Sequence, residues 1–143
     1  MKLSVIIPTY NRSRTLQQGL ASLQQQTFRD FEILVVDNAA DPVVEKQVAA
    51  FSVRYVPEPQ LGLHNARHAG ARAATGSILI FTDDDATYEP NWLRAYADAF
   101  DAHADMAAAG GPVRPVWETK PPQWLLDYIG DTKEFGILSL REP

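Results

Sequence analysis

The chain of 143 residues contains no cysteine. This absence excludes a disulfide-bonded scaffold, a zinc site built from thiolates and a cysteine nucleophile. A run of basic residues is also missing: 13 Lys and Arg stand against 18 Asp and Glu, for a net charge of −5. Nucleic acid is therefore not expected among the partners, because binding its phosphates needs a basic surface.

Long apolar runs are absent as well. The apolar stretch at residues 3–7 is far shorter than the roughly 18 residues of a membrane helix, and no signal-peptide cleavage site follows it. We expect a cytoplasmic protein whose contact with a membrane, where one exists, is peripheral and made by sequence outside this chain. Two glycine-rich motifs, Gly-x-Gly-x-x-Gly after the first strand and Gly-Lys-Ser/Thr, are also missing. A bound nucleotide would then be held through a metal ion rather than by a glycine-rich loop.

What the sequence does contain is an alternation of strand and helix patterns. Apolar, β-branched runs predict strands at residues 3–7, 31–36, 53–56 and 77–81, with a weaker fifth strand at 106–109. Apolar residues at helical spacing lie between them, at 16–23, 44–51, 63–75 and 90–100. The alternation predicts an α/β fold with a mostly parallel sheet and helices on both faces. It ends near residue 113, so we expect a core at 1–113 and a separate segment at 114–143.

Polar residues follow three of these strands at their carboxyl ends, where open parallel sheets bind ligands. The first strand is followed by Thr9, Tyr10 and Arg12, the second by Asp37 and Asn38, and the fourth by Asp83, Asp84 and Asp85. We expect these side chains to meet at one edge of the sheet.

The triplet Asp83–Asp85 is the strongest chemical signal. Three consecutive carboxylates raise one another's pKa unless a positive charge joins them, and hard divalent cations such as Mg²⁺ and Mn²⁺ prefer oxygen ligands. In an extended segment Asp83 and Asp85 would face one way and share the ion, while Asp84 would face the other way. The alternative is a solvated acidic turn with helix-capping character.

Four segments together resemble the motifs of family 2 glycosyltransferases. They are residues 4–12 (SVIIPTYNR), 35–41 (VVDNAAD), 62–70 (GLHNARHAG) and 81–85 (FTDDD), the last followed by Pro90 and Trp92-Leu93. Their order and spacing are similar to the family's over residues 3–113. The resemblance implies the GT-A fold, a Rossmann-like nucleotide-diphospho-sugar transferase fold, truncated here. It also implies inverting, metal-dependent transfer of a sugar from a UDP-, GDP- or dTDP-linked donor to a saccharide or other hydroxyl acceptor.

The resemblance assigns roles position by position. Pro8, Thr9, Tyr10 and Arg12 would lie against the nucleotide, Asp37 would contact the base or ribose with Asn38 beside it, and Arg67 would approach the base or phosphates. Asp84 would lie near the ribose or sugar, and Asp83 and Asp85 would form the Asp-x-Asp pair. Asp85 is the first choice as ligand of Mn²⁺ or Mg²⁺.

The second motif departs from the family at two positions. Ala39 and Ala40 stand where Gly and Ser are usual in the family. An alanine is less favourable than a glycine wherever a turn needs positive φ. We therefore expect a reshaped loop here, with an altered contact to the nucleotide.

The carboxylate that would deprotonate the acceptor hydroxyl is not identified by any pattern. The acidic residues after the core are Glu118, Asp127, Asp131, Glu134 and Glu142. The chain ends at Pro143, before an acceptor-binding region of the family's usual length, and the apolar residues 124–129 lack a predicted packing partner. One open alternative is thus a non-catalytic fragment that binds nucleotide sugar and self-associates through this exposed segment.

A second alternative comes from residues 83–87, which fit the pattern Asp-x-Asp-x-Thr. That pattern is similar to the nucleophile loop of haloacid-dehalogenase-type phosphatases, in which Mg²⁺ assists. In those enzymes the loop follows the first strand, whereas here it follows the fourth, and the expected later lysine and acidic pair are not evident. A phosphatase with Asp83 as its nucleophile is therefore the less favoured interpretation.

Overall fold

A computed structural model describes residues 1–129 of the chain, except for the side chains of Ser13, Tyr128 and Ile129. The chain divides into two compact units, Met1–Ala104 and Asp105–Pro143, and the first contains the sheet. The functional division expected at residue 113 stays a prediction. Among residues 1–129, no helix has the length and apolar character needed to span a bilayer.

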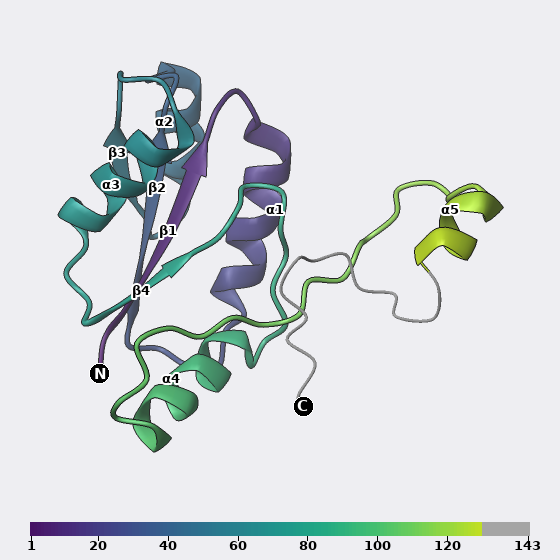
Figure 1. Cartoon of the computed structure of the whole chain (residues 1–143). Coiled ribbons are helices and arrows are strands. Elements are labelled where there is room, and N and C mark those ends of the chain that lie inside the picture. Colours follow the sequence, from purple (N-terminus) through teal and green to yellow (C-terminus); the bar gives the residue numbers. More distant parts are fainter. Residues whose placement is uncertain (130–143) are drawn as a thin grey trace. The chain divides into compact units, whose positions relative to one another are not determined.

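The first unit alternates strand and helix as the sequence predicts (Figure 1). Its elements are β1 (Leu3–Thr9), α1 (Ser13–Gln24), β2 (Phe31–Asp37), α2 (Pro42–Val48), β3 (Arg54–Pro57), α3 (Leu63–Ala73), β4 (Ile78–Phe81) and α4 (Trp92–Ala102). All four strands are parallel, in the order β3-β2-β1-β4. The chain moves outward in one direction from β1 to β3 and then crosses back to β4 on the other side of β1. Such a switch point leaves a crevice for ligands at the carboxyl ends of the strands.

The sheet is covered on both faces because successive strand residues point to opposite sides. The odd-numbered residues of β1 join one core with α1, α2 and α4, to which α1 contributes Leu16, Leu20 and Leu23. Ile6 of β1 joins a second core with α3, whose buried residues include Ala66. The predicted α/β fold with helices on both faces is confirmed.

Helix α3 lies unusually close to the sheet at Gly70. A Cβ atom on Gly70 would collide with the side chain of Ile6 and would lie 3.0 Å from Cγ2 of Val36. Ala66 and Ala69 of the same helix are buried against the sheet. The small residues predicted on one face of this helix therefore let its N-terminus lie beside the carboxyl ends of the strands.

Two boundaries differ from the sequence predictions. Residues 106–109 form no strand, and the sheet within residues 1–129 has four strands. Met106 is followed by three alanines, and alanine is depleted in strands. This run therefore forms a strand only where a neighbouring strand pairs with it. Helix α4 begins at Trp92 rather than at Pro90, because residues 90–91 form a turn before it.

The second unit contains the short helix α5 (Gln123–Ile129) within its described part. Trp124 on this helix is exposed, as is Val116 before it. Exposed apolar side chains agree with the expectation of an unsatisfied surface in this segment. Self-association through it stays a prediction.

Candidate functional site

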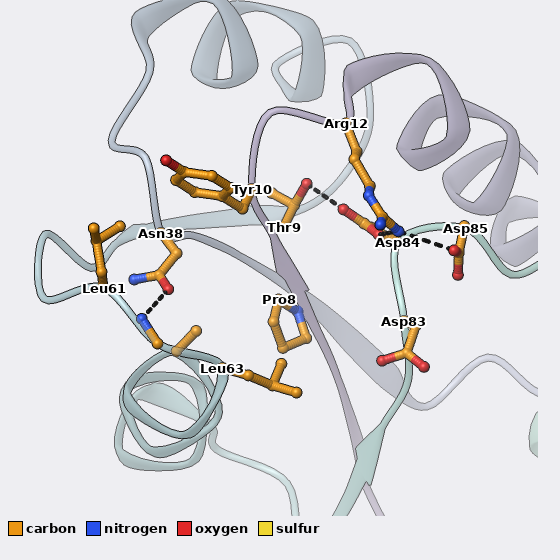
Figure 2. Close-up of a pocket in the computed structure, with 12 residues that line it drawn as sticks. Pro8, Thr9, Tyr10, Arg12, Asn38, Leu61, Leu63, Asp83, Asp84 and Asp85 are labelled. Atoms are coloured by element: carbon orange, nitrogen blue, oxygen red, sulfur yellow. Dashed lines mark hydrogen bonds and ion pairs between the residues drawn. The ribbon is translucent and has the colours of Figure 1, made fainter.

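A cavity of about 590 Å³ opens at the carboxyl ends of β1 and β4, beside the N-terminus of α3 (Figure 2). It is lined by Pro8, Thr9, Tyr10, Arg12, Asn38, Leu61, Gly62, Leu63, Ala66, Asp83, Asp84 and Asp85. Eight of the ten predicted site residues are therefore brought together, while Asp37 and Arg67 are outside the lining. The apolar wall from Leu61 to Ala66 was not predicted, although most of it lies in the third motif.

The hydrogen bond between Thr9 and Asp84 bridges the switch point. Thr9 Oγ1 donates to Asp84 Oδ2 at 2.8 Å, joining the end of β1 to the loop after β4. Both residues are buried, and Asp84 is 7% exposed. Burial raises the pKa of the Asp84 carboxyl, and the Thr9 hydrogen bond and the charge of Arg12 oppose this rise without cancelling it. Asp84 is thus a fixed carboxylate and not a freely moving loop residue.

The acidic triplet is not a straight continuation of β4. The strand ends at Phe81, and Asp84 and Asp85 form a turn. The alternation expected of an extended segment therefore does not apply. In the structure Asp84 and Asp85 share a cationic partner, whereas Asp83 lies apart from them lower on the loop (Figure 2).

Two arginines neutralise most of the charge of the triplet. Arg12 Nη1 lies 3.0 Å from Asp85 Oδ2 and 3.6 Å from Asp84 Oδ1. Arg67 Nη2 lies 3.6 Å from Asp83 Oδ1, so three negative charges meet two positive ones and leave a net charge of −1. The Nε–H of Arg67 is buried and has no hydrogen-bond partner within the described part of the chain. The repulsion that suggested a metal ion is thus offset by these two arginines.

Tyr88 connects the acidic turn to helix α1. Its hydroxyl is 3.0 Å from Thr82 Oγ1 and donates to the carbonyl oxygen of Asp83 at 3.3 Å. Its backbone N–H donates to Ser22 Oγ on α1 at 3.1 Å, and its ring stacks on Trp92 at 4.3 Å between centroids. Burial, with a smaller contribution from the nearby carboxylates, raises the pKa of Tyr88 to about 12, so its hydroxyl stays protonated as a donor. No local sequence pattern predicts this support, because its partners come from distant segments.

Asp37 organises the loop after β2 instead of facing the cavity. Its carboxylate accepts hydrogen bonds from the backbone N–H groups of Ala39 and Asp41 at 2.9 and 2.7 Å, and from the hydroxyl of Tyr55 at 2.9 Å. Asp37 is fully buried. A contact between Asp37 and the base or ribose stays a prediction, and in this structure both carboxylate oxygens are occupied.

Asn38 holds the segment before α3 against the site. Its Nδ2 donates to the carbonyl oxygens of Glu58 and Gln60, both at 2.8 Å, and its Oδ1 accepts from the N–H of Gly62 at 2.8 Å. Gly62 has φ 129°, a conformation that side chains disfavour. The apolar wall of the cavity is therefore positioned by a residue predicted to belong to the donor site.

The loop after β2 has positive φ at Ala40, where the family usually has Ser, and not at Ala39, where it usually has Gly. Ala40 has φ 50°, and the other non-glycine residue with positive φ in the described part is Asn11, at 55°. Both residues line a second hollow, next to the first, which shares Tyr10, Asn38 and Leu61 with it. The two hollows thus adjoin at these three shared residues.

The donor atoms at the acidic turn suit a hard divalent cation, because they are carboxylate oxygens. Among residues 1–129, however, no three Asp, Glu, His or Cys side chains converge as a metal group. Mg²⁺ is commonly held by one or two carboxylates together with water and substrate phosphates. The site therefore fits an ion whose coordination shell is completed by water and by a phosphorylated ligand.

Two of the candidate general bases fall within the described residues. Glu118 and Asp127 belong to the second unit, and Asp127 accepts a hydrogen bond from Gln123 at 2.9 Å within α5. Asp131, Glu134 and Glu142 lie outside the described residues. Apart from the acidic triplet, no Asp or Glu lines the cavity in the part of the chain that is described.

Two relatives match most of the chain in sequence. The chain is 34% identical over 160 residues to validoxylamine A glucosyltransferase of Streptomyces hygroscopicus subsp. jinggangensis, which covers 98% of the chain and 38% of that protein. It is 28% identical over 131 residues to glucosyl-dolichyl phosphate glucuronosyltransferase of Haloferax volcanii, covering 87% of the chain and 42% of that protein. The chain thus spans less than half the length of these relatives.

Solved structures show the same fold. S. aureus TarS 1–349 in complex with UDP matches with a TM-score of 0.64 and 27% identity, over 79% of the chain and 38% of that structure. The mannosyltransferase PcManGT from Pyrobaculum calidifontis, in complex with GDP-Man and Mn²⁺, matches with a TM-score of 0.67 and 24% identity, over 80% of the chain and 36% of that structure. The second likeness concerns the fold alone.

The sequence profile of glycosyl transferase family 2 matches residues 4–141, nearly the whole chain. This match includes all four motifs and every residue that lines the cavity. The chain has the parallel sheet of the GT-A fold, and it belongs to glycosyl transferase family 2.

Proposed function

We propose that the first unit binds the nucleotide-diphosphate sugar donor of an inverting, metal-dependent glycosyltransferase. The observation that carries the proposal is the Thr9–Asp84 hydrogen bond across the switch point, which fixes a carboxylate on the wall of the cavity. Ligands of open parallel sheets bind at this place. The UDP complex of TarS, a relative of the same fold at 27% identity, supports a nucleotide diphosphate as ligand.

In this proposal, different residues of the site contact different parts of the donor. Tyr10 is 53% exposed, and its ring is available to stack on the nucleobase. Thr9 orients Asp84. Asp85, which is exposed at the turn, is the first candidate to hold Mn²⁺ or Mg²⁺, with Asp83 as the second. The metal would stabilise the negative charge that develops on the leaving diphosphate. Arg12 and Arg67 supply positive charge on the same side.

A donor-binding fragment that does not transfer sugar remains a second candidate. It is favoured by the lack of any Asp or Glu other than the triplet among the residues that line the cavity within the described structure. A general base must lie within hydrogen-bond reach of the acceptor hydroxyl. Sugar transfer by this chain with UDP-, GDP- and dTDP-linked donors distinguishes the two candidates, because robust turnover excludes the inactive fragment.

Calorimetry with UDP, GDP and dTDP, with and without Mn²⁺, tests donor binding. We expect one nucleotide to bind in the presence of Mn²⁺, and Asp85→Asn to abolish that binding. Asp101→Asn is the matched control: it removes the same charge from an exposed position at the end of α4, and it should leave binding unchanged. Binding that does not need the metal, or no binding of any of the three nucleotides, would overturn the proposal.

A further inference from the structure

Arg12 lies next to two neighbouring carboxylates of the acidic turn, Asp84 and Asp85. One nitrogen, Nη1, is within 3.0 Å of Asp85 and 3.6 Å of Asp84. Figure 2 shows the guanidinium reaching down from the start of α1 to this point, while Asp83 is turned away. A single cationic group thus contacts Asp85, the first candidate to hold the divalent ion, and its neighbour Asp84.

The two sides of this contact differ in how firmly they are held. Asp84 is buried and bonded to Thr9, so its carboxylate does not move freely. The Arg12 side chain is 60% exposed and Asp85 54%, and ion pairs at such exposure contribute little to stability. The Arg12 side chain can therefore move away from the carboxylates at little cost in free energy.

The Arg12 guanidinium also lines the cavity proposed to hold the donor. A guanidinium presents parallel N–H donors that match phosphate oxygens, so a diphosphate is a good alternative partner. A divalent ion bound to Asp85 would repel Arg12 at its present position, since both are positive. The arrival of the metal and the departure of Arg12 are therefore coupled.

We propose that Arg12 is an exchangeable cation: it neutralises Asp84 and Asp85 in the free protein and moves to the donor diphosphate when the divalent ion binds Asp85. This inference rests on the proposed donor site. It gives Arg12 two effects of opposite sign, competition with the metal in the free protein and attraction of the nucleotide in the complex.

Arg12→Gln separates these effects. Manganese binding to the nucleotide-free protein, followed by electron paramagnetic resonance, should strengthen about two- to fivefold, because the weak competing ion pair is removed. Calorimetry at saturating Mn²⁺, with whichever of UDP, GDP and dTDP binds the wild type most tightly, should show affinity reduced about tenfold or more, because a charged hydrogen-bond donor to phosphate is lost.

Arg14→Gln is the matched control. Arg14 is exposed on the first turn of α1, removes the same charge when replaced, and makes no ion pair with the acidic turn in the structure of residues 1–129. Neither affinity should change more than about twofold, because at this exposure a charge without a contact is screened. A thermal melt of each variant confirms that it is folded.

Opposite shifts in Arg12→Gln, absent in Arg14→Gln, support the exchange. Unchanged or weaker Mn²⁺ binding in Arg12→Gln overturns it, and so does unchanged or tighter nucleotide binding. Equal shifts in both variants also overturn it, because they would reflect net charge alone. A wild type that binds neither Mn²⁺ nor nucleotide overturns the proposed function and the exchange together, whereas a wild type that binds both leaves the donor site standing whatever Arg12→Gln does.

Discussion

Glu32→Gln is expected to remove a large, pH-dependent part of the stability of the first unit. Glu32 lies at the start of β2, where its Oε1 accepts hydrogen bonds from Ser4 Oγ at 2.6 Å and from the N–H and Oγ1 of Thr75 at 2.6 and 2.7 Å. Lys2 Nζ is 3.8 Å from the other oxygen. These contacts tie β1, β2 and the turn before β4 together at the end of the sheet opposite the cavity.

The magnitude follows from the pKa of Glu32. Burial raises it, but the hydrogen bonds from Ser4 and Thr75 and the charge of Lys2 outweigh burial and lower the pKa from 4.5 to about 2. The side chain is 17% exposed, so screening by solvent is limited. The difference between 4.5 and about 2, at about 1.36 kcal/mol per pH unit, gives about 3 kcal/mol as an upper value.

The sign is that of a carboxyl with a lowered pKa in the folded state. Its contribution is fully present above pH 4.5 and is lost as the pH falls from 4.5 towards 2, because the unfolded chain takes up the proton first. In the wild type this part of the unfolding free energy should therefore decline over that range. In Glu32→Gln it should be missing at every pH, since an amide does not titrate there.

Urea unfolding at pH 7 and at pH 3, followed by tryptophan fluorescence, measures both effects. The gap between wild type and Glu32→Gln should be about 2–3 kcal/mol at pH 7 and clearly smaller at pH 3. Glu45→Gln is the control, because Glu45 is exposed on α2 and makes no ion pair within residues 1–129. A gap of equal size at the two pH values would refute the reasoning.

Three further substitutions test other contacts. Ala40→Gly should stabilise the chain by about 0.5–1 kcal/mol, because Ala40 has φ 50° and the relief of left-handed strain exceeds the extra entropy of glycine; an unchanged urea midpoint would contradict this. Gln26→Leu should destabilise it by about 2–5 kcal/mol in urea unfolding, since buried Gln26 bonds Glu89 O at 2.7 Å and the Leu93 N–H at 2.9 Å, and a loss under about 1 kcal/mol would be unexpected. Tyr88→Phe should weaken Mn²⁺-dependent nucleotide binding about fivefold in calorimetry, because the acidic turn loses its supporting hydroxyl, whereas an affinity equal to the wild type would show that the turn holds itself.

The periodic elements of the first unit could be predicted because their signals are local. The buried run of β1, the leucines of α1 at helical spacing and the small face of α3 each lie within a dozen residues of sequence. The apolar run at 106–109 predicts a strand that does not form, because apolar character alone does not show whether a partner strand is present. The positive φ of Ala40 could not be predicted, because the sequence shows an alanine in the loop but not the φ that the loop needs there.

The sequence by itself determined the parallel α/β fold, the edge of the sheet at which the polar residues gather and the membership of their motifs in one family. Only the tertiary structure decided how those residues are paired. The Thr9–Asp84 bond joins residues 75 positions apart, Arg12 reaches Asp85 from a different loop, and Tyr88 supports the turn through α1. The turn at Asp84 and Asp85 also brings both carboxylates to Arg12, whereas an extended segment would have pointed them to opposite sides. Periodicity specifies which face a residue is on, whereas partners across a switch point depend on how distant segments pack.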